Sequence, residues 1–407
     1  MIINTCQIRG SAEDKAYSQT GYYKRLKKNN PDLKIVMAGC VAQQNKEEVF
    51  KRLPHVDIVV GTQNIKDIPE LVRRAFEGES KIVLADKQKD RSNYDYYEDV
   101  TPIRESDISA WVTIIEGCDY FCTYCVVPYT RGRQISRKPQ AVLDEIKKLA
   151  DQGFKEVTLL GQTVDSYGKD FTDLKFDMAD LLRAIHEISG IERIRFMTSH
   201  PLDFSDRMIE AIAELPRLME YIHMPMQAGD DTVLEKMRRG YTAEQYYALV
   251  DKIHARIPGV LISGDYIVGF PGETEAQFQN TLESVKRAGI YHANTAVYSA
   301  RKQTPAALWE SRGESIPDDV KKDRLDRLNA VITEQAFSKN RAVEHQTVEV
   351  LVEGKSRRNE ARLMGRMRDN RVVNFDSDSS EDDLVGKLVQ VHITQAMPFS
   401  LLGTHLQ

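Results

Sequence analysis

The segment Glu116-Gly117-Cys118-Asp119-Tyr120-Phe121-Cys122-Thr123-Tyr124-Cys125 holds three of the five cysteines of the chain. They are spaced Cys-x3-Cys-x2-Cys, directly after an apolar run near 111–115 that predicts a strand. Three closely spaced thiolates suit an iron–sulfur cluster of four irons, because three ligands leave one iron open for a substrate or cofactor. The alternative is zinc, which would need four ligands, usually in two separated pairs, and no nearby His completes such a set. We therefore expect Cys118, Cys122 and Cys125 to bind an iron–sulfur cluster.

A repeat of strands and helices surrounds this segment. Amphipathic helix patterns, such as the stripe from Val142 to Leu149 closed by Gly153, alternate with apolar runs. The expected strands lie near 111–115, 157–160, 194–196, 221–223, 260–268 and 293–298. Six such units predict a (β/α)6 partial barrel, in which functional groups lie at the carboxyl ends of the strands.

Two further domains flank the barrel, since 407 residues are too many for one ordinary core. Residues 1–86 predict an N-terminal parallel α/β domain, and the polar, Tyr-rich stretch 87–106 predicts a linker. The barrel takes 107–340. Alternating runs in 341–407 predict a small antiparallel β-barrel. The fold class is therefore α/β with a β-barrel at its end.

Composition narrows the possible environment. Hydrophobic residues make up 41% of the chain, with no apolar run long enough to cross a bilayer and no signal-peptide pattern, so we expect a cytoplasmic monomer without a membrane partner. The odd number of cysteines, five, favours reduced thiols for metal binding over a disulfide framework.

Charge is unevenly distributed. The net charge of −5 argues against a uniformly basic nucleic-acid binder. Residues 355–371, however, hold seven Lys and Arg against two acidic residues, which is a phosphate-binding footprint. Acidic residues follow at once over 376–383, and charge alone favours a solvated surface of mixed sign.

Several strings are more specific than the cysteine triad. They are Cys125-Val126-Val127-Pro128-Tyr129-Thr130-Arg131-Gly132-Arg133, Leu160-Gly161-Gln162, Thr198-Ser199-His200-Pro201 and Ile267-Val268-Gly269-Phe270-Pro271-Gly272-Glu273. Together they resemble the methylthiotransferases of the radical S-adenosylmethionine (SAM) superfamily over the whole chain. The resemblance is strongest to the MiaB type, which adds a methylthio group at C2 of N6-dimethylallyl-adenosine, position 37 of tRNA, beside the anticodon.

This resemblance implies how the chemistry is divided. The open iron of the triad cluster would bind SAM, and reduction would split SAM to a 5′-deoxyadenosyl radical. Tyr124 would lie near the adenine of SAM, unless it is only a packed aromatic. Gln162 and Gln227 follow apolar strands and could hydrogen-bond the ribose or amino-acid part of SAM. No catalytic acid or base is expected, because the cofactor does the hard chemistry. For His200 and His223, structural and functional interpretations are equally open.

Family members hold a second [4Fe–4S] cluster with three cysteines of the N-terminal domain. Asn4-Thr5-Cys6 and Ala38-Gly39-Cys40 match two of those motifs, and the third, upstream motif is absent. Either the start of the chain has been lost or Cys6 and Cys40 bind the cluster with two thiolates. We expect truncation, because a sheet without its opening strand leaves an unpaired edge.

The C-terminal module resembles a TRAM domain, a small RNA-binding barrel, on Gly365-Arg366 and Asn370-Arg371-Val372-Val373-Asn374-Phe375. This implies RNA contacts by Arg366, Arg368 and Arg371. One departure from the family is Gln162-Thr163-Val164-Asp165, where Gln-Asn-Val-Asn is frequent.

The expected partners are tRNA, an electron donor such as a flavodoxin or ferredoxin, and a sulfur or iron–sulfur donor. Two alternatives stay open. One is a methylthiotransferase for threonylcarbamoyl-adenosine tRNA or a ribosomal-protein aspartate, and the other is a non-catalytic RNA-binding iron–sulfur protein.

Overall fold

The computed structural model describes residues 1–7, 10–86 and 102–406. The chain divides into two compact units, each built from several segments. Unit 1 comprises Met1–Thr101, Glu116–Ile135 and Ser299–Gly313, and unit 2 comprises Pro102–Ile115, Ser136–Tyr298 and Glu314–Gln407. Most of the predicted linker, residues 87–101, lies outside the described residues.

Unit 1 is built on a parallel sheet of four strands in the order β1–β2–β3–β4. The strands are β1 (Ile2–Thr5), β2 (Val36–Gly39), β3 (Ile58–Val60) and β4 (Ile82–Leu84). Its helices are α1 (Gly10–Asn29), α2 (Cys40–Asn45), α3 (Glu48–Arg52), α4 (Ile68–Phe76), α5 (Val127–Thr130) and α12 (Pro305–Trp309), with the short turns η1 (Ile65–Asp67) and η3 (Glu310–Glu314). The sheet buries Ile35, Met37 and Val59 against one set of helices, as expected for a strand apolar on both faces.

Unit 2 contains the six predicted barrel strands, arranged as two parallel sheets, β5–β8–β9 and β10–β11–β12. They are β5 (Ser109–Thr113), β8 (Glu156–Leu160), β9 (Arg193–Phe196), β10 (Tyr221–His223), β11 (Leu261–Val268) and β12 (His292–Val297). A bridge between Ile194 and Leu218 joins the end of the first sheet to the segment before β10. The partial barrel is confirmed, with each strand within two residues of its predicted start.

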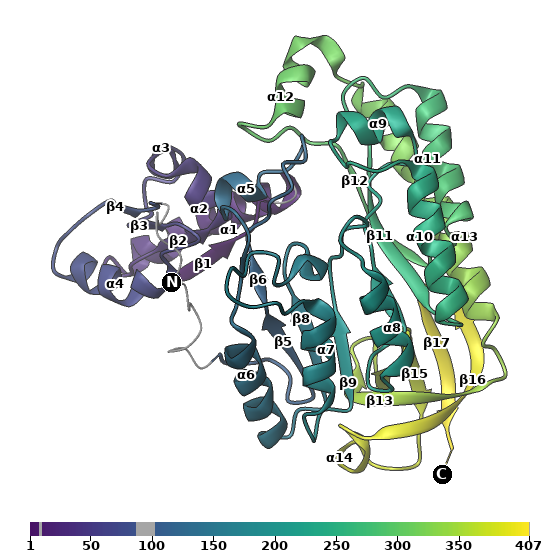
Figure 1. The fold of residues 1–407 in the computed structure, drawn as a ribbon. Coiled ribbons are helices and arrows are strands. Elements are labelled where there is room, and N and C mark those ends of the chain that lie inside the picture. Colours follow the sequence, from purple (N-terminus) through teal and green to yellow (C-terminus); the bar gives the residue numbers. More distant parts are fainter. Residues whose placement is uncertain (8–9, 87–101, 407) are drawn as a thin grey trace. The chain divides into compact units, whose positions relative to one another are not determined.

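Helices cover the outer side of these sheets (Figure 1). They are α6 (Pro139–Asp151), α7 (Met178–His186), α8 (Asp206–Glu214), α9 (Asp231–Lys236), α10 (Ala243–Arg256), α11 (Glu275–Arg287) and α13 (Asp318–Arg341), and short elements β6 (Ile115–Glu116), β7 (Ile135–Ser136) and η2 (Val164–Ser166) lie between strands. Capping boxes at Asp177, Thr242 and Thr274 start α7, α10 and α11 by satisfying their first backbone N–H groups.

The second sheet has two distinct faces, because side chains alternate along a strand. The hydroxyl of Tyr266 on β11 is hydrogen-bonded with Ser284 of α11, and Thr295 of β12 with Asn329 of α13, so these positions face the helices. Their neighbours in register, Asp265 and Asn294, therefore face the opposite side, the lumen of the partial barrel.

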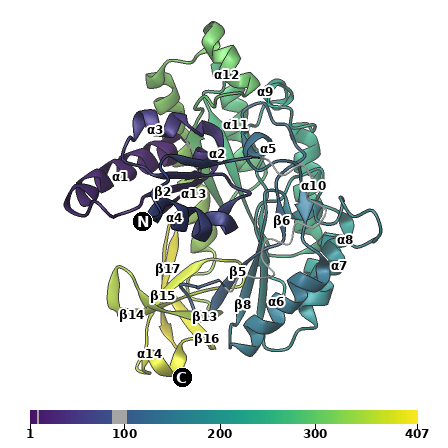
Figure 2. The ribbon, with the colours of Figure 1, turned by 90° about the vertical axis from the view of Figure 1, so that its left-hand side faces the viewer.

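The C-terminal part of unit 2 is a closed barrel in the order β13–β14–β15–β17–β16. Its elements are β13 (Thr347–Ser356), β14 (Asn359–Arg366), β15 (Val372–Asp376), α14 (Glu381–Leu384), β16 (Leu388–Met397) and β17 (Ser400–His405). Four strand pairs are antiparallel, as predicted, and the parallel pair β15–β17 closes the barrel. Figures 1 and 2 both show this small barrel beside β5, β8 and β9, at the end away from the strands' carboxyl termini.

Candidate cofactor-binding site

The cysteine segment of unit 1 forms a tight loop before α5. Cys118 and Cys122 are buried, Cys125 is half-buried, and none of the three is in a disulfide. Gly117 has φ +73°, and a Cβ atom there would lie 2.2 Å from the carbonyl oxygen of Arg133. Only glycine allows this close approach without strain, so Gly117 fixes the turn that presents Cys118.

Neighbouring segments of unit 1 hold this loop in place. The Thr62 hydroxyl donates to the carbonyl of Thr130 (2.8 Å), and the Gln63 amide donates to the carbonyl of Arg131 (3.1 Å). On the other side, the Ala306 N–H donates to the carbonyl of Thr123, between two of the cysteines (3.0 Å). The loop is therefore supported by the sheet domain and by the segment that follows β12, although the three parts are far apart in sequence.

Cys6 and Cys40 lie side by side at the ends of β1 and β2. Thr5 is paired with Gly39 in the parallel register, and each cysteine is the next residue. The Thr5 hydroxyl bridges the two strands, donating to the Ala38 carbonyl (2.5 Å) and accepting from the Val41 N–H (3.2 Å). The two cysteines predicted to share a cluster are thus brought together by the sheet.

The thiol groups fit a cluster better than a single ion. In the described residues, no three His, Cys, Asp or Glu side chains lie close enough together to hold one metal ion. The ligands of a four-iron cluster bind different irons and therefore stand farther apart than those of a mononuclear site. Three cysteines outside any disulfide on one short loop are the donor set that such a cluster uses.

Gln162 follows β8 at the carboxyl end of the first sheet of unit 2. Its Oε1 atom is buried and has no hydrogen-bond partner among the described residues. A buried carbonyl oxygen without a donor costs free energy unless a ligand supplies the donor. Before it, Gly161 packs so closely on Ile115 that a Cβ would lie 1.9 Å from Cγ2 of that side chain. The rim of the sheet therefore presents Oε1 of Gln162 as an acceptor to which a ligand can donate a hydrogen bond.

Thr198 follows β9 and Gln227 follows β10, and both residues have unusual backbone conformations. Their φ angles are +75° and +77°, a left-handed region that non-glycine residues rarely adopt. The Gln227 N–H donates to the Asp265 carbonyl (2.9 Å), and its own carbonyl accepts from Ile267 (2.9 Å), which holds the strained residue in place. Strain of this kind gathers at functional sites. Sequence reasoning proposed Gln227 but missed Thr198, because nothing in the sequence signals a left-handed threonine.

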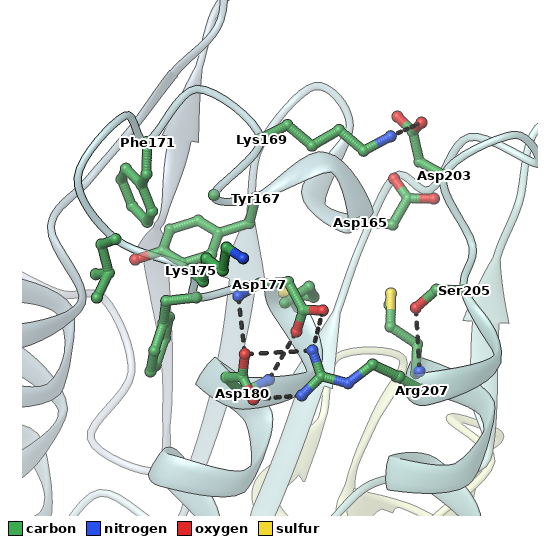
Figure 3. Close-up of a pocket in the computed structure, with 15 residues that line it drawn as sticks. Asp165, Tyr167, Lys169, Phe171, Lys175, Asp177, Asp180, Asp203, Ser205 and Arg207 are labelled. Atoms are coloured by element: carbon green, nitrogen blue, oxygen red, sulfur yellow. Dashed lines mark hydrogen bonds and ion pairs between the residues drawn. The ribbon is translucent and has the colours of Figure 1, made fainter.

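A pocket of about 370 Å³ lies beside this rim, between the loop after β8 and the starts of α7 and α8. Figure 3 shows Arg207 pointing at Asp177 and Asp180, and Lys169 at Asp203, with an ion pair in each case. These ion pairs engage most of the charged side chains of the pocket wall with one another, so the pocket by itself assigns no ligand.

Asp165 lines the inner end of the same pocket and is almost fully buried. One carboxyl oxygen accepts from the His200 N–H (2.7 Å), while the other, Oδ1, has no hydrogen-bond partner among the described residues. Burial, and then the charge of Asp203, raise the pKa of Asp165 well above its usual value. Burial likewise lowers the pKa of His200 far below its ordinary range, so this imidazole is neutral. His200 therefore supports the rim in its neutral form.

The three arginines proposed for RNA bind other parts of unit 2. Arg368 donates to both carboxylate oxygens of Glu220 (2.7 and 2.9 Å) and to the carbonyls of Pro216 and Leu218, just before β10. Arg371 is nearly buried and pairs with Asp369 (3.3 Å). Arg366 pairs with Glu353 (3.0 Å) on β13. The sequence could not reveal the partners of Arg368, which lie about 150 residues away along the chain.

Two arginines of β9 bind the segment of the small barrel that carries Arg368. Arg193 donates to the carbonyl of Arg366 (2.6 Å) and to Glu349 of β13 (3.0 Å). Arg195 donates to the carbonyls of Met367 (2.9 Å) and Arg368 (3.1 Å), while its Nε binds Glu156 (2.8 Å). We call the turn 367–371 with Arg193 and Arg195 the docking turn. It fixes the small barrel on the partial barrel through the backbone carbonyls of Arg366, Met367 and Arg368.

Three known families match three successive parts of the chain. The radical SAM superfamily matches residues 112–285, the uncharacterised protein family UPF0004 matches 1–61, and the TRAM domain matches 341–406. A tRNA-2-methylthio-N(6)-dimethylallyladenosine synthase of Anoxybacillus flavithermus is 44% identical over 99% of this chain and 75% of its own length. A protein of that name from Clostridium novyi is 46% identical over 99% of this chain and 87% of its own. The chain belongs to the radical SAM methylthiotransferase family.

Solved structures agree on the fold of this methylthiotransferase. The radical S-adenosylmethionine methyltransferase TsrM from Kitasatospora setae, with cobalamin and a [4Fe-4S] cluster bound, superposes with a TM-score of 0.57 at 16% identity. The match covers 76% of this chain and 63%, less than two thirds, of that chain. The cofactors of the family are SAM and [4Fe–4S] clusters, and the three cysteines of the loop and the unpartnered Oε1 of Gln162 fit them.

No helix of this methylthiotransferase that the structure describes combines the length and the apolar character of a membrane span.

Proposed function

We propose that this methylthiotransferase adds a methylthio group to C2 of N6-dimethylallyl-adenosine at position 37 of tRNA. The observation that supports this best is the name shared by relatives that are 44–46% identical over nearly the whole chain. The cysteine triad supplies thiol ligands for one of the two clusters that the reaction needs, and the adjacent pair Cys6 and Cys40 supplies two of the three expected for the other.

Different residues of the chain have different roles in this reaction. Cys118, Cys122 and Cys125 would hold one cluster, which would pass one electron from the external donor to SAM and so give methionine and a 5′-deoxyadenosyl radical. Gln162 and Gln227 orient SAM by hydrogen bonds, and Tyr124 packs on its adenine. The C2–H bond has no acidic proton, so no side chain is required as a general base. Cys6 and Cys40 hold the second cluster, which serves as the platform for the transferred sulfur.

For RNA, partly exposed cations are the proposed phosphate contacts. Arg366 and Arg368 each retain a third of their side-chain surface, 34%, beside their structural pairs, and Arg371 supports their turn. Arg357 and Arg358, in the exposed connection between β13 and β14, extend this surface. Phosphate contacts of this kind give binding that weakens with salt.

The remaining assignments follow from the same function. We propose a cytoplasmic monomer with a flavodoxin or ferredoxin as electron donor and a separate sulfur or iron–sulfur donor. The proposed domains are residues 1–86, 107–340 and 341–407, with 87–106 as a linker.

The function is tested by anaerobic reconstitution with iron and sulfide, followed by reaction with SAM, a reductant and tRNA bearing dimethylallyl-adenosine. We expect 5′-deoxyadenosine and 2-methylthio-nucleoside, detected by mass spectrometry of the digest. Cys118→Ala should abolish both products. Cys40→Ala should abolish methylthio transfer and leave deoxyadenosine formation. Tight zinc without iron, or modification only of threonylcarbamoyl-adenosine tRNA or of a ribosomal-protein aspartate, would refute the proposal. RNA binding without deoxyadenosine formation would instead identify a non-catalytic binder.

A further inference from the structure

The turn that ends α9 contains an arginine in a backbone conformation that favours glycine. The Arg238 N–H donates to the carbonyl of Glu235 (2.8 Å). The Arg239 N–H donates to the carbonyl of Leu234 (2.9 Å). This pair of hydrogen bonds is the Schellman motif, in which the residue at the position of Arg238 is left-handed and usually glycine. Arg238 has φ +58°, so the chain keeps an arginine where a Cβ atom causes strain.

The Arg238 side chain makes no contact that would offset this strain. Its guanidinium is exposed and forms no hydrogen bond, ion pair or ring contact within the described part of the chain. Lys81, another cation with φ +58°, differs, because its Nζ donates to the carbonyls of Pro54 and Val56. A residue that breaks a local conformational rule without a benefit to the fold points to a functional role.

The turn is fixed at the rim of the partial barrel. Figure 1 shows α9 at the end of the barrel where β11 and β12 finish. Nη2 of the buried Arg239 donates to the carbonyl of Pro225 (2.9 Å). The hydroxyl of Tyr241, also buried, donates to the carbonyl of Met226 (2.9 Å). Both carbonyls lie within three residues of the end of β10, so Arg238 is presented on a turn that is tied to the rim.

The surface beside this turn is partly apolar. Leu202, in the connection after β9, is 51% exposed and packs on the turn, since a Cβ atom at Gly240 would lie 3.1 Å from Cδ1 of that leucine. On the same connection, Asp203 holds Lys169, whose side chain is 57% exposed. An exposed apolar side chain next to a cation suits RNA, because the cation binds phosphate while the apolar group contacts a base.

We propose that Arg238 binds a backbone phosphate of the substrate RNA at the rim of the partial barrel. Arginine suits this role, because its guanidinium is always charged and presents two parallel N–H donors to a phosphate. The target base must reach the carboxyl ends of the strands, where SAM is proposed to bind, so a phosphate beside that base meets the rim. This inference rests on the proposed function, in which tRNA is the substrate, and adds a contact separate from those of the small barrel.

Three substitutions in the reconstituted full chain separate the charge of Arg238 from its backbone strain. Arg238→Gly removes both, Arg238→Gln removes only the charge, and Arg238→Lys keeps both. Equilibrium binding of an anticodon stem-loop RNA bearing dimethylallyl-adenosine is measured without reductant over a series of salt concentrations. Arg238→Gly and Arg238→Gln should raise the dissociation constant about 3- to 10-fold and reduce the salt dependence by roughly one phosphate contact, while Arg238→Lys stays near the wild type.

Thermal unfolding gives a second readout, in which the same variants behave differently. Only Arg238→Gly relieves the strain, so its unfolding midpoint should rise by roughly 2 °C, whereas Arg238→Gln and Arg238→Lys should keep the wild-type midpoint. Glycine at this position should therefore stabilise the protein and weaken RNA binding together. Lys322→Gln, which removes an exposed cation of α13, is the matched control and should change neither property.

The outcomes separate the candidate roles of this arginine. Wild-type RNA binding by both Arg238→Gly and Arg238→Gln overturns the inference. A lower midpoint for Arg238→Gly also overturns it, by giving the arginine a structural role. Normal RNA binding with a higher requirement for an acidic electron donor, such as flavodoxin, in SAM cleavage would assign the surface to that protein instead. Binding needs no turnover, so a wild-type chain that binds RNA but transfers no methylthio group refutes the proposed function and leaves the test of Arg238 standing.

Discussion

Asp165 is a buried acid whose ionised form is disfavoured by its surroundings. Burial and the nearby charge of Asp203 raise its pKa above the usual value, so the folded protein binds a proton that the unfolded chain has released. Stability therefore falls as the pH rises from the unfolded pKa towards the raised pKa of the folded state, and does not return above it. Asn, which the family often has at this position, carries no charge to bury.

The predicted result is that Asp165→Asn stabilises the protein above about pH 4, the pKa of an unperturbed aspartate, and removes part of the pH dependence. Thermal unfolding midpoints measured across the acidic and neutral range check this. Asp173→Asn, an exposed position on the same loop, is the control and should follow the wild type. A wild-type pH profile for Asp165→Asn would contradict the raised pKa.

Substitution of Gln162 is predicted to change the binding of SAM and to leave the stability of the fold unchanged. Because its Oε1 makes no hydrogen bond in the described structure, Gln162→Leu loses no internal contact of that atom. We expect an unchanged thermal midpoint and a dissociation constant for SAM raised about tenfold, the worth of one hydrogen bond. Gln279→Leu, on the exposed side of α11, serves as the comparison. Unaltered SAM binding would remove Gln162 from the site.

Strand β9 is part of the partial barrel and also anchors the docking turn. Arg195→Leu should destabilise unit 2 by roughly 3–5 kcal/mol, since it leaves Glu156 buried without its cation and removes one hydrogen bond from each of two backbone carbonyls. Urea unfolding measures the change. Arg256→Ala, which breaks an exposed ion pair with Glu210, should have little effect. Equal, small losses in both variants would show that the docking turn contributes no stability.

The sequence predicted the six barrel strands, because apolar runs and glycine-rich turns are local signals. It did not predict β4, a three-residue strand that is too short for a periodic pattern. The sequence also could not predict that Arg368 binds Glu220, because 148 residues separate them. A basic run in the sequence does not show whether its side chains contact RNA or a carboxylate of the same chain. The backbone angle of Thr198 is fixed by tertiary packing and leaves no trace in composition.

For the whole molecule, removal of residues 346–407 is a poor test of RNA binding. That deletion also removes the docking turn and leaves Arg193, which is 1% exposed, without Glu349. Reversal of exposed charges in the intact chain avoids this problem. Arg357→Glu with Arg358→Glu should weaken tRNA binding and reduce its salt dependence by roughly two phosphate contacts, with SAM cleavage in the absence of RNA unchanged.

The comparison for that pair is Lys147→Glu, a charge reversal on the exposed side of α6, which should leave tRNA binding near the wild-type value. Binding measured by filter retention over a series of salt concentrations gives both the affinity and the slope. A double reversal at Arg357 and Arg358 with the wild-type slope would mean that RNA approaches another surface of the chain.

The docking turn also bears on how these domains can be recombined. A small barrel taken from another protein brings its own turn, while Arg193, Arg195 and Glu220 stay behind with the recipient. Such a chimera would fold its two parts and still lose their junction, unless the arginines on β9 and the partner of Arg368 were transplanted with the barrel. Lineages that exchanged this module would therefore be expected to change both sides of the junction together, and residues 341–407 would be inherited with the strand that anchors them.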